Sequence, residues 1–374
     1  MEGLIERHPR HREKLFFLMF AGAISIILLV IGGYQLVEFS DSTAFCGQLC
    51  HDVMYPEYAA YQASPHSRVL CSECHVGSGA DYLVRSKLSG IPQIIAVTTG
   101  SYERPIPTPV KNLRPARETC EQCHRPERFA GDLVRVHTSY QPDEQNTEKV
   151  DTRVLRVGGG ESEIAQDIHW HIAATVWYLS PDEKRQEITW VGVEDSNGNL
   201  TEYIDPKRAS EITPERIQEE KRLMDCMDCH NRATHIFRSP EELIDMAISQ
   251  GKIDRSLPFI KREGVTALDP PNSSLEEAFA KVEAIEEFYK ISYPQIYEEK
   301  AAAIDKTIEE LKEAARLTTF PYMKVDWKTY INNAGHMESP GCFRCHGKLV
   351  ATEGDQQNKV IDADCQACHY FELR

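Results

Sequence analysis

The sequence has no cysteine outside one repeated motif, and this excludes two common uses of the residue. All 12 cysteines fall into six closely spaced pairs, so none is left over for a separate disulfide or a catalytic thiol. Apolar residues are also scarce. They make up 41% of the 374 residues, and a conventional hydrophobic core of this size usually needs more. We therefore expect another group to fill part of the interior.

Positive charge is in short supply as well. Lys and Arg number 42 against 58 Asp and Glu, which gives a formal net charge of −16. A chain this acidic is not expected to bind nucleic acid, because phosphates attract basic surfaces. The simplest interpretation of the acidity is a solvated exterior.

Long hydrophobic runs are absent except for one near the N-terminus. Residues 15–37 carry no charge, and about 20 apolar residues are enough to cross a hydrocarbon core of about 30 Å. Basic residues precede this run, and Glu38 and Asp41 follow it. The positive-inside rule then predicts a single-pass anchor with a cytoplasmic N-terminus and an exported main body. The basic residues are Arg7, Arg10, Arg12 and Lys14.

A cleaved signal peptide is the alternative to an anchor. Its apolar region is usually only about 7–15 residues long and ends at a small-residue cleavage site, which Val37, Glu38 and Phe39 do not provide. We therefore favour an uncleaved anchor. His8 and His11 then lie on the cytoplasmic side, away from any exported cofactor.

The six cysteine pairs share one feature, which is a histidine directly after the second cysteine. This C-x-x-C-H pattern is typical of covalent attachment of c-type haem, with two thioethers to the porphyrin and the histidine as an iron ligand. Disulfides or zinc sites are the alternatives, but neither explains the repeated histidine. The pairs are Cys46/Cys50, Cys71/Cys74, Cys120/Cys123, Cys226/Cys229, Cys342/Cys345 and Cys365/Cys368, followed by His51, His75, His124, His230, His346 and His369. Only the first pair has three intervening residues instead of two.

Six irons with six proximal histidines need six further ligands to be low-spin, and six other histidines remain outside the motifs and the cytoplasmic tail. They are His66, His137, His169, His171, His235 and His336. His169 and His171 are two residues apart, so we expect them to serve two neighbouring haems, or one of them to support the other. His235 is too close in sequence to His230 to bind the same iron and should serve another haem. Met54 is an alternative ligand for the first haem, and a Met ligand would raise its potential.

The segments between the motifs differ in character. Residues 39–130 hold three motifs with little regular secondary structure predicted between them. Residues 131–210 contain no cysteine, and the runs 188–193 and 200–204 flank Asn197-Gly198, which is a strong hairpin signal. We predict a small β insertion there that supplies distal histidines.

Residues 211–374 are predicted to be mainly helical and to carry the last three haems. Thr213-Pro214 and Ser239-Pro240 are helix starts, Gly251 is a stop, and Ser274 caps a longer stretch that breaks near Pro294 and resumes to about residue 317. The fold class expected is a multihaem cytochrome c, mainly α, with little regular structure around the haems. Residues 1–38 are expected to form a cytoplasmic tail and one transmembrane helix.

Several motifs in residues 10–130 occur in an order that resembles the NapC/NirT family of membrane-anchored cytochromes c, which oxidise quinol. They are the anchor, residues 46–54, His66, Cys71 to His75, Gly77, Gly79, Lys87, Pro105, Pro109, and residues 120–126. The resemblance implies that Lys87 lines a quinol pocket near the first haem. In the family, a Met two residues past the first motif's histidine binds this haem, whereas Met54 here stands three past His51. The family's carboxylate two turns after the lysine has no match, because Gln93 and Ile94 occupy that region.

The function implied is a hexahaem quinol dehydrogenase in the bacterial inner membrane, alone or in a homo- or hetero-oligomer. Electrons would pass from menaquinol or another quinol in the membrane pool, through six covalent haems, to a periplasmic cytochrome or reductase. The later part of the chain looks like the larger multihaem members found in anaerobically respiring bacteria. Two alternatives stay open. One is a reductase with an open-coordination haem, and the other is a passive relay fed by a separate quinone-oxidising subunit.

Overall fold

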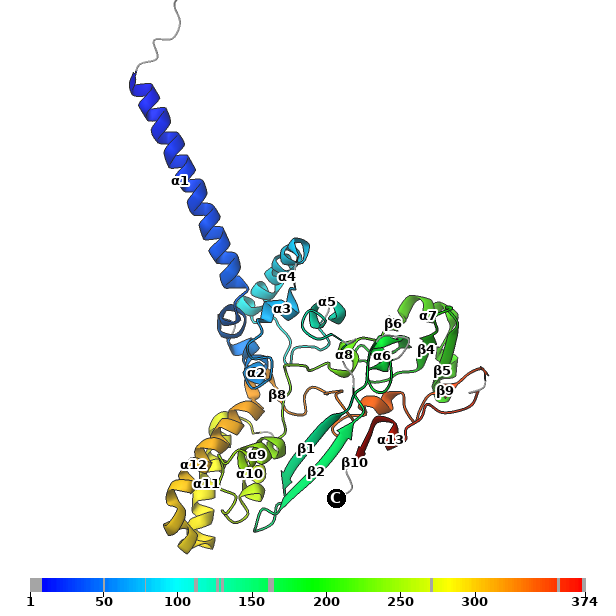
Figure 1. Ribbon diagram of the computed structural model, residues 1–374. Helices are drawn as coiled ribbons and strands as arrows, with labels where there is room; N and C mark the ends of the chain where they lie inside the picture. Colours follow the sequence, from blue (N-terminus) through cyan, green and yellow to red (C-terminus); the bar gives the residue numbers. More distant parts are fainter. Residues whose placement is uncertain are drawn as a thin grey trace, which may run out of the picture.

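A computed structural model of the chain describes residues 9–49, 51–77, 79–110, 114–125, 128, 131–160, 165–269, 272–354 and 357–371, with backbone alone for residues 9–12, 51 and 371. Its most conspicuous element is α1 (Pro9–Ser40), which stands away from the rest of the protein (Figure 1). Residues Glu13–Ser40 are long and apolar enough to cross a membrane, and none of their apolar window is buried. This agrees with the predicted anchor. His8, and the side chain of His11, lie outside the described residues.

The segment after the anchor contains more helix than the sequence predicts. Besides short turns at the motifs, it forms α2 (His51–Gln62) and α4 (Ala80–Thr99). Each of these helices contains a proline, Pro56 and Pro92, which normally disfavours a helix interior. α2 is held by burial of Val53, Ala59 and Ala60 against Phe320 and Met323 of the C-terminal part. Tertiary packing thus overrides a local signal that suggested irregular chain.

The predicted β insertion is present, but it is not closed on itself. β1 (Leu133–Tyr140) pairs with β2 (Glu148–Leu155), and the C-terminal β10 (His369–Phe371) adds to β2. A second, antiparallel sheet has the order β6-β3-β4-β5-β9. Its strands are β3 (Thr175–Leu179), β4 (Trp190–Glu194), β5 (Leu200–Ile204), β6 (Arg222–Leu223) and β9 (Val350–Ala351). Short strands with free edges gain hydrogen bonds by recruiting distant segments.

The predicted hairpin is confirmed, since β4 and β5 pair in antiparallel register around Asn197 and Gly198. Gly198 has a positive φ of 82°, which the hairpin turn needs and a glycine adopts without strain. The insertion packs around the buried side chains of Tyr178 and Trp190.

Helices dominate the C-terminal part as predicted. They are α7 (Pro214–Glu220), α9 (Pro240–Ser249), α10 (Ile260–Leu268), α11 (Leu275–Ser292) and α12 (Pro294–Thr318). The side chains of Thr213, Ser239 and Ser274 each accept a hydrogen bond from a first-turn N–H, so the three predicted caps are confirmed. α9 to α12 share one apolar core, and short strands β7 (Thr319–Phe320) and β8 (Val325–Asp326) follow it.

The core of these helices gives a direct stability prediction. Leu311 is completely buried, whereas Ile291 on α11 is 72% exposed. Leu311→Ala should lower the free energy of unfolding by about 2–5 kcal/mol, because it removes buried methyl groups and leaves a cavity. Ile291→Ala should change it by less than about 0.5 kcal/mol. Chemical denaturation followed by far-UV circular dichroism would measure both, and equal effects would contradict this assignment of the core.

Candidate functional site

Each regular cysteine motif folds as one helical turn. The histidine N–H donates a hydrogen bond to the carbonyl of the first cysteine, at 2.7 Å for His124, 2.8 Å for His230 and 3.1 Å for His346. The turns are α3 (Cys71–His75), the end of α5 (Ala116–Cys120), α8 (Cys226–Cys229), η5 (Gly341–Arg344) and α13 (Cys365–Cys368). Helical spacing of three and four residues puts both thiols and the imidazole on one side, which covalent haem attachment requires.

The two cysteines of the third motif differ in exposure. Cys123 is exposed, whereas Cys120 of the same motif is half-buried. The physical reason is local, because the chain turns tightly after α5: the Cys123 N–H donates to the Cys120 carbonyl at 3.2 Å, and the next residue, His124, is exposed as well. The charge of Cys123 acts on the thiol of Cys74, so Cys123 lies toward the second motif. An exposed thiol is accessible for thioether formation, and its position therefore suits haem attachment.

The irregular first motif coincides with an irregular helix. Phe45–Leu49, termed η1, is a π-helix, a wider turn that accommodates one extra residue. A wider turn offers a physical reason why this motif can contain three residues between its cysteines instead of two. Gly47 is needed there, because a Cβ at this position would lie 2.2 Å from the ring of Tyr58. Cys50 and the side chain of His51 lie outside the described residues.

Four proximal histidines lie ring to ring with four of the predicted distal ones. The ring centroids are 6.2 Å apart for His75 and His235, 5.9 Å for His124 and His66, 5.8 Å for His346 and His171, and 6.1 Å for His369 and His336. Two imidazoles that bind one metal from opposite sides, each with a metal–nitrogen distance of about 2.0–2.1 Å, have centroids roughly 6 Å apart. The observed separations therefore fit haem iron between the rings.

His169 lies close enough to His230 for their charges to interact, so it adjoins the fourth motif. His137 is different. It is exposed on β1, which packs against β2 and α9, and its ring meets no described proximal histidine ring. Met54 is partly buried against the apolar cluster of Val53 and Phe237.

The hydrogen bonds of several rings suit metal binding. The Nδ1 atoms of His171, His235 and His346 face the backbone carbonyls of Ile168, Glu57 and Asp362. A ligating histidine commonly donates one N–H to such a carbonyl, which leaves the other nitrogen for the metal. Burial lowers the pKa of His171 and lowers that of His235 to about 4, so both rings are neutral at pH 7. The residues present therefore fit haem c.

Alternative uses of the cysteines receive no support from their arrangement. The eleven cysteines that the structure describes form no disulfides. Within the same described residues, no group of three or more His, Cys, Asp and Glu side chains is placed to hold a metal ion.

Consecutive motifs are neighbours in space. The thiols of Cys46 and Cys71 are within hydrogen-bonding reach, as are those of Cys120 and Cys226. Other cysteines of successive motifs lie close enough for their charges to interact: Cys74 with Cys120 and Cys123, Cys229 with Cys342, and Cys342 with Cys368. Figure 1 accordingly shows α3, α5, α8 and α13 following one another from the base of α1 toward the far side. The motifs thus run through the protein in sequence order.

Lys87 lies at the junction of α4 and the membrane helix. Its Nζ donates a hydrogen bond to Ser40 Oγ at 2.7 Å and forms an ion pair with Asp41. Both side chains are partly accessible, at 36% for Lys87 and 26% for Asp41. Their charges act on the thiol of Cys46, so the ion pair lies beside the first motif.

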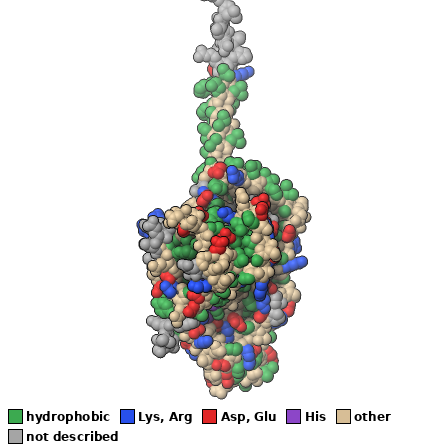
Figure 2. Space-filling view, turned by 90° about the vertical axis from the view of Figure 1, so that its right-hand side faces the viewer, with side chains coloured by type: hydrophobic (Ala, Val, Ile, Leu, Met, Phe, Trp, Pro, Cys, Tyr) green, Lys and Arg blue, Asp and Glu red, His purple; other side chains and the backbone are tan. Residues whose placement is uncertain are grey.

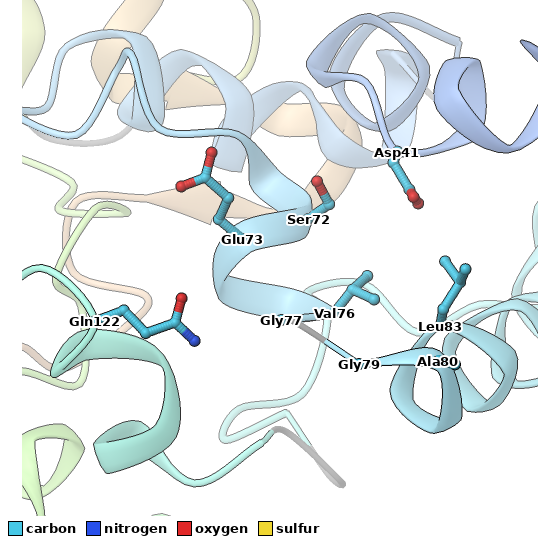
Figure 3. Close-up of a pocket in the computed structure, with 9 residues that line it drawn as sticks. All are labelled: Asp41, Ser72, Glu73, Val76, Gly77, Gly79, Ala80, Leu83 and Gln122. Carbon is cyan, nitrogen blue, oxygen red and sulfur yellow. The ribbon is translucent and has the colours of Figure 1, made fainter.

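A cavity of about 380 Å³ opens next to this ion pair. Asp41, Glu73, Val76, Leu83 and Gln122 are among the residues that line it (Figure 3). Asp41 was not singled out from the sequence as a site residue, because only folding brings it to Lys87 across 46 positions. The signal that the sequence offered was its position: Asp41 is the second carboxylate after the apolar run, following Glu38.

Comparisons with known proteins identify the family of this chain. Residues 8–106 match the family model described as "NapC/NirT cytochrome c family, N-terminal region". Over 370 residues the chain is 46% identical to "Cytochrome c-type protein ImcH" of Geobacter sulfurreducens, which covers 98% of this chain and 72% of that protein. No solved structure gives a significant match. With its membrane helix and repeated haem motifs, the chain belongs to the NapC/NirT family of membrane-anchored multihaem cytochromes c.

Proposed function

We propose that the protein oxidises membrane quinol beside Lys87 and Asp41 and passes the electrons to a periplasmic acceptor. The observation that carries this proposal is the Lys87–Asp41 ion pair, which stands directly after the membrane span and beside the first haem motif. A cavity adjoins it. The pair is thus reachable from the bilayer and close to an electron acceptor, which are the two conditions for quinol oxidation.

The two side chains have complementary tasks in this reaction. Each quinol that becomes quinone releases two electrons and two protons. The Lys87 ammonium can only donate hydrogen bonds, so it orients a quinol oxygen. The Asp41 carboxylate accepts a proton from a quinol hydroxyl and releases it to water on the exported side. Haem c bound at the motifs supplies one-electron oxidation and reduction at its iron.

We further propose five histidine pairs as axial ligands. They are His75 with His235, His124 with His66, His230 with His169, His346 with His171, and His369 with His336. The centroid separations support four of these pairs, and the closeness of His169 to His230 supports the fifth. His51 binds the first iron, with Met54 as the candidate second ligand, and His137 is left over. Together with the adjacency of the motifs, this gives an electron path in sequence order.

The haem content should be six per chain. Pyridine haemochrome analysis against protein mass is expected to give this number for the wild type, and five for Cys50→Ser, because the first motif then lacks one of the two thiols that attach the haem. Cys365→Ser should likewise remove one haem from a regular motif and serves as the control. Five haems in the wild type and no further loss in Cys50→Ser would mean that the π-helical motif holds none.

The proposed reaction is tested with the purified full-length protein in nanodiscs. A menaquinol analogue should reduce the haems with no other subunit present, as followed by the haem absorbance bands. Reduction by dithionite alone, with no response to quinol, would instead support a passive relay fed by another subunit.

A reductase with an open-coordination haem is the second candidate function. The observation that favours it is that the first haem lacks a second ligand among the five proposed pairs. Electron paramagnetic resonance should show this haem as low-spin if Met54 binds it. A high-spin signal that shifts on addition of nitrite or another small substrate would support the reductase.

A further inference from the structure

Helix α4 carries an apolar stripe that no part of the described protein covers. Val84, Leu88, Ile91 and Ile95 are 53–62% exposed, and no residue of α4 is buried. Their spacing of four, three and four residues places them on one side of a helix. The stripe is about 16 Å long at a rise of about 1.5 Å per residue. Soluble surfaces rarely expose so continuous an apolar strip.

The stripe is tied to the end of the membrane span. Lys87, on the same helix, donates to Ser40, the last residue of the span, and pairs with Asp41, the next residue. These contacts hold α4 near the end of the membrane span. In Figure 1 α4 extends from the body on the same side as α1, and Figure 2 shows hydrophobic side chains along α1 and over the top of the body where α1 joins it.

Two exposed polar side chains of α4 lie away from the stripe. A rotation of about 100° per residue places Gln93 opposite Val84, and Ser89 also faces away from the stripe; both are exposed. An interfacial membrane helix has this distribution, with its apolar face about 5–10 Å deep in the boundary between headgroups and acyl chains.

We infer that α4 is a second membrane-contacting element, which lies in the bilayer interface through Val84, Leu88, Ile91 and Ile95. The occupant of the stripe is lipid, because the stripe continues the apolar surface of α1 at the same level of the molecule. The bilayer then contacts the protein on two sides of the Lys87–Asp41 pair. This inference concerns lipid contact and does not depend on quinol oxidation.

Photo-crosslinking of the full-length, haem-loaded protein in nanodiscs of phosphatidylethanolamine and phosphatidylglycerol tests the inference. A benzophenone amino acid would replace Leu88 or Ile91 in the stripe, Gln93 on the opposite side as the matched control, or Leu28 in α1 as the positive control. Mass spectrometry after irradiation should find lipid adducts at Leu88 and Ile91 about as often as at Leu28, and several-fold more often than at Gln93. Unchanged haem spectra would show that each variant is folded.

Three results would overturn the inference. They are an absence of lipid adducts at Leu88 and Ile91 when Leu28 gives them, crosslinks from the stripe to a second copy of the chain, and crosslinks from the stripe to haem. Wild-type protein in nanodiscs with a diazirine-bearing acyl chain gives the reciprocal measurement without any substitution. Labelled peptides should then include residues 80–99 as well as α1, and labelling of α1 alone would equally reject the inference.

Discussion

Asp41→Asn is expected to slow haem reduction by a menaquinol analogue by about 10²-fold, because general base catalysis typically contributes 10²–10⁴-fold and asparagine cannot accept the quinol proton. Lys87→Ala should have a similar effect, since it removes the group that orients the quinol oxygen and separates the ion pair. Stopped-flow absorbance in nanodiscs would measure both rates. Reduction by dithionite and the haem spectra should stay unchanged, because neither residue belongs to a haem motif.

Glu73→Gln is the matched control for this pair of variants. Glu73 lines the same cavity as Asp41, but Lys87 pairs with Asp41. The control should keep the wild-type rate with quinol. If Glu73→Gln slows the reaction and Asp41→Asn does not, the proton acceptor has been assigned to the wrong carboxylate. Wild-type rates in both Asp41→Asn and Lys87→Ala would remove the ion pair from the quinol site.

His171→Ala is expected to convert one haem per chain from low-spin to high-spin and to shift one reduction potential. The ring of His171 is 5.8 Å from that of His346, and its Nδ1 is held by the carbonyl of Ile168 at 2.8 Å. Removing it opens one side of the fifth iron. Electron paramagnetic resonance and a redox titration would measure the two changes. Added imidazole should restore the low-spin signal by occupying the space that the side chain leaves.

His137→Ala provides the comparison, because this histidine is exposed on β1 and outside the five proposed pairs. Its spectrum should match the wild type. A new high-spin haem in His137→Ala would return His137 to the set of ligands, with the first iron as its partner. No change in His171→Ala would reject the ligand pairs as a whole, since His171 has the same ring geometry as the other three measured pairs.

The local features of this protein were predictable from its sequence because short-range chemistry decides them. The haem motifs depend on residues three to five positions apart, and the membrane helix depends on one uncharged run. The caps at Thr213, Ser239 and Ser274 and the turn at Gly198 likewise need only neighbouring residues. The number of histidines suggested that six of them are distal ligands. Spacing in the sequence excluded only pairs of close neighbours, such as His230 and His235, from binding the same iron.

The tertiary structure decided which distant residues meet. His235 lies beside His75 and His66 beside His124, pairings that depend on the path of the whole chain and have no local signal. The same holds for Asp41, which reaches Lys87 because α4 folds back to the end of α1. α4 itself contains Gly90 and Pro92, so its local propensity suggested an irregular segment. A one-sided apolar stripe becomes visible only once the helix exists, because only helical rotation brings Val84, Leu88, Ile91 and Ile95 to the same side.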